Sequence, residues 1–314
     1  MTQWSALRGV FVASSLAVVA SLAACGRNTP QNGTPTRRTW TVMGTFLTAT
    51  VWGDDDAAKR ALDAAHAAVD RVDSLMSTYR PESEISQVNR RAGTDSVTVL
   101  SPETADVLAS ALRYAARTGG ALDVTVGPLV DVWGFHAHAG TVPPPATLDS
   151  ARALVGWQRV QFDSAARTVR LPRHGMRLDF GAIAKGYALD RAEQAMRRAG
   201  ARRGMVDLGR NVLVFGPPPH GGQWRAAVVN PLDPQTTIGT LLMDSGAVAT
   251  SGDYEQFFQA GGQRYGHIFD PRTGMPVQGI ASTTVVAPTG IASDALSTAL
   301  FVLGPDAGCA LADT

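Results

Sequence analysis

The segment IASDALSTALFVLG, residues 291–304, carries oxygen-bearing side chains at helical spacing. Asp294, Ser297 and Thr298 are separated by three and four residues, so a helix would present them on one face. A carboxylate and hydroxyl groups are hard oxygen ligands that suit magnesium. The same segment could instead cap a helix, with Ser293 or Asp294 accepting hydrogen bonds from free backbone N–H groups. The spacing leaves both interpretations open.

The segment RLDFGAIAKGYALDRA, residues 177–192, combines small residues with one cation. Gly181, Ala182 and Ala184 would let a bulky ligand approach the backbone where a helix begins. Lys185 lies among them, and a cation there suits an anionic group. The segment is not a P-loop, because its lysine does not follow the required glycine spacing. We expect it to contact a ligand that carries negative charge.

Two other polar residues stand among apolar ones. Asp123 in ALDVTVGP follows a pair of glycines and is either a strand carboxylate near a site or an aspartate that stabilises a turn. His267 in HIFDPRTGMP comes just before a turn indicated by composition, DPRTG. It could be a general base or a hydrogen-bonded core histidine. The residue types alone do not separate these roles.

Several well-known catalytic patterns are missing from the sequence. It contains no Cys and His cluster at zinc spacing, no GxSxG and no GxGxxG. The aromatic residues of TVMGTF, LMSTY and VWGF could stack on a planar ligand, although a place in the hydrophobic core is their default role.

The elements that position these residues are short strands and a few separate helices. Strands are predicted at 39–52 (interrupted at Gly44), 157–163, 168–172, just before Phe180, 204–209, 211–216, 224–230, 237–244, 246–252, 264–270 and 281–288. Helices are predicted from Asp54–Asp56 through Met76, from Ser101 to about Thr118, from the residues after Phe180 to about Ala199, and from Ser293 to Leu303. The residues 139–149 read as a loop. This order favours an α+β fold with mixed or antiparallel sheets and flanking helices.

Composition and charge narrow the class of protein. The chain has 314 residues, of which 45% are hydrophobic and 18% charged, enough for one large or two modest domains. The formal net charge of +1 argues against a broad basic surface for nucleic acid. Any recognition by charge is therefore expected to be local.

The N-terminus resembles an export signal. Arg8 precedes an apolar run that ends in the lipobox Leu-Ala-Ala-Cys25, and a polar tether follows. We expect residues 1–24 to be a lipoprotein signal peptide, Cys25 to be lipidated, residues 25–38 to form a flexible tether, and residues 39–314 to form the domain. A transmembrane anchor is the alternative, but the run is short for a span. With Cys25 lipidated, Cys309 is the remaining cysteine, so no disulfide framework is expected.

Seven segments in order resemble the successive motifs of one family, the ApbE family of FAD:protein FMN transferases. They are TVMGTF, STYRPESEISQVN, GGALDVTVGPLVDVWGF, LDFGAIAKGYALD, ATSGDYEQFF, HIFDPRTGMPV and APTGIASDALSTALFVLG. The resemblance spans about residues 39–304. It implies an ApbE-like architecture related to the T-fold.

The resemblance also implies an activity. A periplasmic, membrane-anchored, magnesium-dependent enzyme would transfer FMN from FAD to a threonine of a target protein, typically a subunit of a sodium-pumping or electron-transfer complex, and release AMP. Two alternatives use the same residues: hydrolysis of FAD to FMN and AMP, or flavin binding by a non-catalytic lipoprotein. No nucleic-acid partner is expected.

Matching positions in the motifs suggest roles for individual residues. The implied FAD site consists of Met43, Tyr79, Ala121, Leu122, Asp123, Asp179, Lys185 and Phe269. The implied magnesium ligands are Ala182, through its backbone carbonyl, Asp294 and Thr298. A base is also needed near the incoming threonine, and His267 is our candidate.

The sequence departs from the family pattern in two places. Arg210 in DLGRN stands where the family usually has a second glycine, a change that can reshape the loop near the ligand. Family members usually continue into a strand-containing tail, whereas this sequence ends at Thr314, as expected for a truncated C-terminal end.

Overall fold

The computed structural model describes residues 34–137 and 139–312. The predicted signal peptide, Cys25, which was predicted to be lipidated, and the first part of the predicted tether lie outside these residues. Within the described ranges, the helices are all too short or too polar to cross a membrane.

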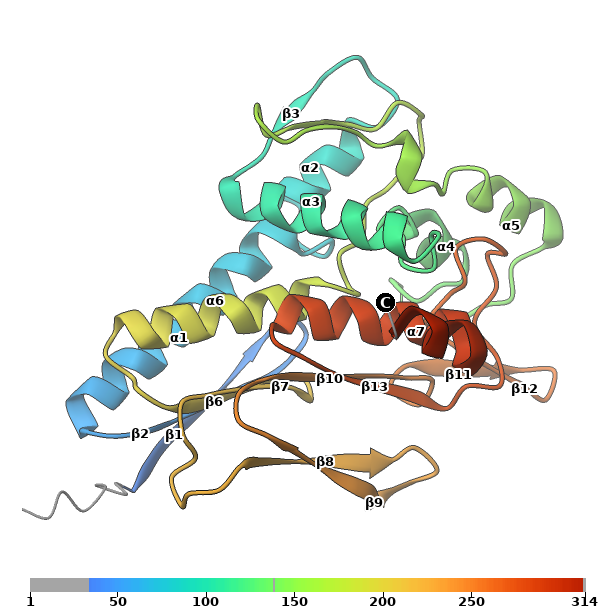
Figure 1. The fold of residues 1–314 in the computed structure, drawn as a ribbon. Coiled ribbons are helices and arrows are strands. Elements are labelled where there is room, and N and C mark those ends of the chain that lie inside the picture. The colour runs from blue at the N-terminus through green and yellow to red at the C-terminus, as the bar shows by residue number, and fades with distance from the viewer. Residues whose placement is uncertain (1–33, 138, 313–314) are drawn as a thin grey trace, which may run out of the picture. The chain divides into compact units, whose positions relative to one another are not determined.

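A six-stranded sheet forms the base of the fold, in the order β1-β2-β6-β7-β10-β13 (Figure 1). Its strands are β1 (Pro35–Val42), β2 (Thr45–Trp52), β6 (Gly204–Leu208), β7 (Asn211–Phe215), β10 (Gly246–Gly252) and β13 (Ser282–Ala287). Each neighbouring pair of these strands is antiparallel. The first strand begins four residues before Thr39, so residues 35–38, which were assigned to the tether, belong to β1.

The break expected at Gly44 is a tight hairpin turn between β1 and β2. Val42 pairs with Thr45, so Met43 and Gly44 form a two-residue loop. Both have positive φ, 53° and 69°, which is the conformation of a type I′ turn. The turn directs Met43 toward the candidate site described below.

Three helices cover one face of this sheet (Figure 1). They are α1 (Asp55–Met76), α6 (Ala184–Arg198) and α7 (Gly290–Ala312). The helix α1 begins at the aspartates as predicted, Asp54 caps it by accepting hydrogen bonds from the N–H groups of Asp56 and Ala57, and the helix buries its apolar stripe in the core. His66 beside that stripe stacks on Trp40, with ring centroids 4.8 Å apart.

The N-terminal ends of α6 and α7 meet at two glycines. A Cβ on Gly186 would lie 2.1 Å from the carbonyl oxygen of Gly290, and a Cβ on Gly290 would lie 2.3 Å from that of Gly186. Asp190 of α6 accepts hydrogen bonds from the N–H groups of Gly290 and Ile291, at 2.6 and 2.9 Å. This carboxylate therefore caps α7 from a neighbouring helix. It also explains why α7 begins at Gly290, three residues before the predicted Ser293.

Beyond Leu303 the predicted helix end is a kink. Gly304 has φ 75° and ψ 179°, and helical structure resumes at Pro305. Proline suits the first turn of the second segment because its fixed φ is helical and it has no N–H that needs a partner.

A second group of elements lies on the far side of these helices from the sheet (Figure 1). It contains α2 (Glu84–Arg90), α3 (Pro102–Arg117), α4 (Gly127–Val132), α5 (Pro145–Arg152), β3 (Thr98–Val99), β4 (Gln161–Asp163) and β5 (Thr168–Arg170). Ser101 caps α3 and Pro102 opens it, as the sequence predicts. The predicted strand at 157–163 is wrong in its first part, because Trp157–Arg159 form a short 3-10 helix.

Two hairpins complete the described chain. They are β8 (Trp224–Asn230) with β9 (Asp233–Met243), and β11 (Phe257–Ala260) with β12 (Gln263–Gly266). The strand predicted at 264–270 ends early at Gly266. Beyond it, a single bridge joins Phe269 to Pro276, because the turn expected at Asp270–Gly274 reverses the chain there.

Candidate functional site

One cavity of about 890 Å³ lies where the helix N-termini meet the second group of elements. That volume is within the range of about 300–1,000 Å³ found for small-molecule sites. Its lining includes every residue that the sequence assigned to FAD, metal or base: Met43, Tyr79, Ala121, Leu122, Asp123, Ala182, Asp179, Lys185, His267, Phe269, Asp294 and Thr298. These residues come from segments up to 255 positions apart, so the fold brings the whole predicted set to one place.

Asp294 links α7 to the first turn of α6. Its Oδ2 accepts a hydrogen bond from the backbone N–H of Gly186 at 2.8 Å, and its Oδ1 accepts one from Nδ2 of Asn211 at 2.8 Å. In a regular helix this N–H would point at the carbonyl of Ala182, four residues back. Asp294 takes the place of that carbonyl as acceptor. Burial raises the pKa of the Asp294 carboxyl, and the positive charge of Lys185 opposes the rise.

The capping interpretation holds for Asp294 but on a different helix, and it is wrong for Ser293. Asp294 caps α6 instead of its own helix, and the Ser293 hydroxyl donates to the carbonyl of Gly290 at 2.9 Å instead of accepting from an N–H. Of the three residues predicted to share one helix face, Asp294 and Thr298 line the cavity and Ser297 does not. Ser297 is buried against Ser251, 2.9 Å away, while Thr298 lines the cavity and lies 3.1 Å from the same Ser251 hydroxyl.

A group of charged side chains surrounds this end of the cavity. Burial raises the pKa of Glu255, the positive charges of Lys185 and Arg210 act against that rise, and the negative charge of Asp294 adds to it. Within the described residues, no three His, Cys, Asp or Glu side chains gather into a metal-binding cluster. The predicted metal set needs only one of those residue types, because its other two donors are a hydroxyl and a backbone carbonyl.

Asp123 performs the turn-stabilising role that the sequence left open, and it also lines the cavity. Its Oδ1 accepts from the N–H and the hydroxyl of Thr125 at 2.8 and 2.7 Å, and its Oδ2 accepts from the N–H of Trp157 at 2.9 Å. The strand alternative is wrong, because residues 121–124 form a bend and the start of a turn and none of them is in a strand. Burial raises the pKa of this carboxyl, although the hydrogen bonds oppose the rise.

His267 lies in the cavity wall with its ring neutral. Burial lowers its pKa to about 4, a hydrogen bond to the carbonyl of Gln256 works against this, and the charge of Lys185 lowers it further. Nδ1 lies 3.2 Å from that carbonyl and must carry the proton to donate to it, which makes Nε2 the basic nitrogen. The arrangement therefore suits a proton acceptor.

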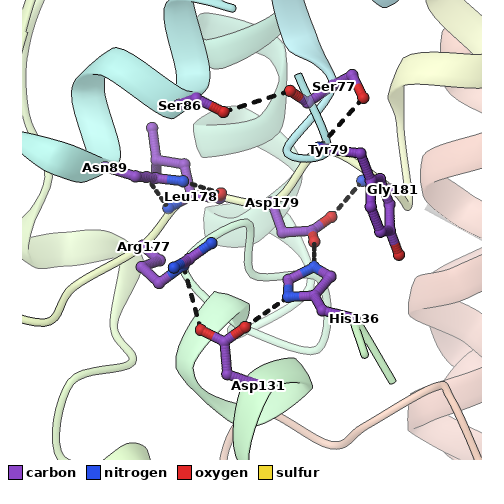
Figure 2. A network of polar contacts seen from close by, with 10 residues as sticks. All are labelled: Ser77, Tyr79, Ser86, Asn89, Asp131, His136, Arg177, Leu178, Asp179 and Gly181. Atoms are coloured by element: carbon purple, nitrogen blue, oxygen red, sulfur yellow. Dashed lines mark hydrogen bonds and ion pairs between the residues drawn. The ribbon is translucent and has the colours of Figure 1, made fainter. Parts of the chain in front are cut away.

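Asp179 lies in an extended segment that the sequence predicts as a strand before Phe180. The strand prediction is wrong, because the segment makes a single parallel bridge, Arg177 to Val126. Asn89 replaces a neighbouring strand: its side-chain amide donates to the carbonyl of Leu178 at 2.9 Å and accepts from the same residue's N–H at 2.7 Å (Figure 2). This pairing holds the backbone extended and fixes the position of Asp179.

A histidine that the sequence reasoning missed completes this side of the cavity. His136 lies between two carboxylates, with Nδ1 2.6 Å from Asp131 and Nε2 2.9 Å from Asp179 (Figure 2). The two aspartates raise its pKa to about 9, overcoming the effect of burial, and it lowers that of Asp179 in turn. The ring of Tyr79 meets the imidazole edge-on, with centroids 5.6 Å apart. The sequence signal for His136 is its position directly after VWGF, a segment in which the sequence suggested a ligand contact only for the aromatic residues.

Comparisons with known proteins agree on one family. Residues 43–314 match the ApbE family. A relative from Klebsiella pneumoniae named FAD:protein FMN transferase is 34% identical over 271 residues, covering 84% of this chain and 77% of the relative. One of the same name from Haemophilus influenzae is 33% identical over 316 residues, covering 95% and 88%.

Solved structures support the same relationship. The ApbE protein from Thermotoga maritima is 32% identical, has a TM-score of 0.83, and covers 88% of this chain with 90% of its own. The flavin transferase ApbE from Vibrio cholerae is 31% identical with a TM-score of 0.78, and the match covers 89% of this chain and 90% of that one. The expected α+β class, with antiparallel sheets and flanking helices, is thereby confirmed.

Proposed function

Because the chain belongs to the ApbE family, we propose that it is an FAD:protein FMN transferase, which moves FMN from FAD to a threonine of an acceptor protein and releases AMP. The observation that carries this proposal is the convergence of the expected FAD, metal and base residues on one cavity of suitable volume.

The proposed reaction exchanges one phosphorus–oxygen bond for another. The threonine oxygen attacks the phosphorus on the flavin side of the FAD diphosphate and forms a phosphoester bond with it. The bond from that phosphorus to the bridging oxygen breaks, and AMP leaves with the bridging oxygen. The hydroxyl proton passes to a base on the protein.

His267 is the proposed base. Its neutral ring carries a lone pair on Nε2, because Nδ1 donates to Gln256. A pKa of about 4 makes the ring a weak base in the protein alone. Bound diphosphate would bring negative charge into the cavity, which stabilises the imidazolium and raises this pKa toward neutrality.

Magnesium is part of the proposal, and the donor set fits it. Asp294 is a buried carboxylate whose pKa is raised, so the protein's own cations leave part of its charge uncompensated. The hydroxyl of Thr298 and the carbonyl of Ala182 border the same cavity and are hard oxygen donors. When bound, the ion would offset the charge of the phosphates. Lys185 would bind and orient the same diphosphate from the start of α6.

We also propose that the protein acts outside the cytoplasm as a lipoprotein anchored through Cys25, with a subunit of a membrane electron-transfer or sodium-pumping complex as acceptor. Support comes from the lipobox in the sequence. The test is mass spectrometry of a candidate acceptor domain after incubation with the enzyme, FAD and magnesium. Flavin that stays on the acceptor after denaturation supports transfer; release of FMN and AMP with an unmodified acceptor would instead indicate FAD hydrolysis.

Asp294→Asn tests the metal assignment without removing the side chain. The amide keeps an acceptor for the Gly186 N–H, and Asn211 can turn its own amide to match, so we expect the variant to fold. Transfer should be lost while FAD binds more weakly. Equal activity of this variant and the wild type in magnesium would overturn the assignment, and bound FAD with no turnover in either protein would favour a flavin-binding protein without catalysis.

Lys185→Ala tests the binding role of the cation. We expect the dissociation constant for FAD to rise by about tenfold, the loss of roughly one charge-assisted hydrogen bond to the diphosphate. Arg191→Ala, at an α6 position outside the cavity lining, is the matched control and should leave the constant unchanged. An unaltered constant in Lys185→Ala would make that lysine structural.

A further inference from the structure

Four charged side chains of alternating sign, Arg177, Asp131, His136 and Asp179, form a connected row (Figure 2). Arg177 lies 3.2 Å from Asp131, whose other carboxylate oxygen lies 2.6 Å from Nδ1 of His136. Nε2 of the same ring lies 2.9 Å from Asp179. This row of side chains connects α4 to the extended segment before α6. It ends on Asp179 in the cavity wall.

The geometry fixes the charge of His136. Ionised carboxylates accept hydrogen bonds and cannot donate them, so both ring nitrogens must carry a proton to bond to Asp131 and Asp179. The ring is then an imidazolium. A neutral ring would turn a lone pair toward one of the two carboxylates, which is repulsive at these distances. Among the described residues, Tyr79, from the segment after α1, is a further ionisable group whose ring meets this imidazole.

The imidazolium determines how Asp179 faces the cavity. One carboxylate oxygen accepts from the N–H of Gly181 at 2.7 Å and the other from His136 at 2.9 Å. These two bonds hold the carboxylate plane and keep the group ionised, and each oxygen retains a second lone pair. A fixed, ionised carboxylate accepts hydrogen bonds only, so it selects ligand groups that donate: N–H of a base or flavin ring, or O–H of a sugar or ribityl chain.

We propose that His136 is a positioning residue for FAD: clamped between Asp131 and Asp179, it holds Asp179 as an oriented acceptor for a donor group of the dinucleotide. This rests on the proposed function, since it takes FAD as the ligand. The residue does not touch the reacting atoms. It acts on affinity through Asp179, so loss of the imidazolium raises the KM for FAD and leaves kcat within about twofold.

The experiment measures the dissociation constant for FAD between pH 6 and 10.5 in the folded wild type and three variants. Wild-type affinity should be constant below about pH 8 and fall as pH rises through about 9, where His136 loses its proton. His136→Gln should bind about tenfold more weakly at pH 7 and lack that alkaline fall. The expected factor is the loss of one charge-assisted hydrogen bond to Asp179.

The other two variants locate the titrating group. Tyr79→Phe removes the neighbouring phenol, and it should retain the fall near pH 9. Asp131→Asn removes the outer carboxylate, so the fall should move to lower pH because one anion then stabilises the imidazolium instead of two. Unfolding curves at each pH show whether a variant is folded.

The outcomes separate this proposal from the function on which it rests. If the wild type fails to bind FAD, the proposed function fails. If FAD binds but His136→Gln keeps the wild-type constant and the alkaline fall, the positioning role is refuted. It is equally refuted if Tyr79→Phe abolishes the fall, or if His136→Gln lowers kcat at saturating FAD while its KM is unchanged.

Discussion

The crossing of α6 and α7 makes a quantitative prediction for Gly186→Ala. In most helices this substitution stabilises the protein by about 1 kcal/mol, because alanine loses less backbone entropy on folding. Here the new Cβ would lie 2.1 Å from the carbonyl oxygen of Gly290 and 2.6 Å from Cβ of Asp294. Neither neighbour is the end of a flexible side chain. The two helices must therefore separate.

The cost has two parts. Overpacking at a close backbone contact costs about 1–3 kcal/mol. Separation also stretches the hydrogen bond from the Gly186 N–H to the Asp294 carboxylate, a charge-assisted bond worth about 1.5–3 kcal/mol. After the helix-propensity gain of about 1 kcal/mol is subtracted, we expect a net loss of about 1.5–5 kcal/mol. At about 2–4 °C per kcal/mol for a large domain, Tm should fall by at least about 3 °C.

Gly308→Ala is the matched control, since it places the same methyl group in α7 where the nearest neighbouring atom is 3.5 Å away. It should leave the protein as stable as the wild type or about 1 kcal/mol more stable. Both variants are compared by urea unfolding followed by circular dichroism and by thermal melting. A Gly186→Ala protein that unfolds at the wild-type urea concentration would refute the close-crossing argument.

Two further predictions concern His136 and Arg210. The pKa of His136 is raised from 6.5 to about 9, so its stabilisation is complete below about pH 6.5 and is lost as pH rises through 9. That pKa difference corresponds to about 3 kcal/mol of stability, which solvent screening at half-exposed Asp131 reduces to about 2 kcal/mol. Urea unfolding should therefore show His136→Gln less stable than the wild type by this amount at pH 6 but little different at pH 10. A difference in stability that stays the same at both pH values would contradict the linkage. Arg210 has a φ of 70°, so Arg210→Gly should keep or slightly raise stability while weakening FAD binding, measured by flavin fluorescence. Arg167→Gly, with φ 52° in an exposed turn, is its control and should leave FAD affinity unchanged.

The helices could be predicted because their signals are local. The aspartates before α1, the Ser-Pro start of α3 and the glycine after α6 act within a few residues of their own backbone. The start of α7 could not be predicted in this way. Its cap is Asp190, a hundred positions earlier in the chain, and nothing near Gly290 signals it.

The strand predicted for the extended segment before α6 was wrong for the same reason. Its apolar residues suggest a strand, but its backbone is held by the side chain of Asn89 and by isolated contacts with residues 124–126, which do not make a strand ladder. The composition of a segment does not reveal which group will satisfy its N–H and C=O.

The candidate site was predicted mostly through ordered motifs, because single residues left their roles open. The spacing of Asp294 fits a cap or a ligand, and only the tertiary structure shows that it caps a neighbouring helix, α6, and also lines the cavity. His136 was missed because its partners, Asp131 and Asp179, are five and forty-three positions away and their convergence depends on tertiary structure.

The mutual capping of α6 and α7 has a consequence for how this protein can change over time. Asp190 and Asp294 each belong to one helix and complete the first turn of the other, so neither helix end is finished without its neighbour. A mutation that disturbs the framework at this junction also displaces Lys185 and the oxygen atoms beside it. Folding and ligand recognition thus depend on the same few atoms. A substitution selected here for its effect on one also changes the other.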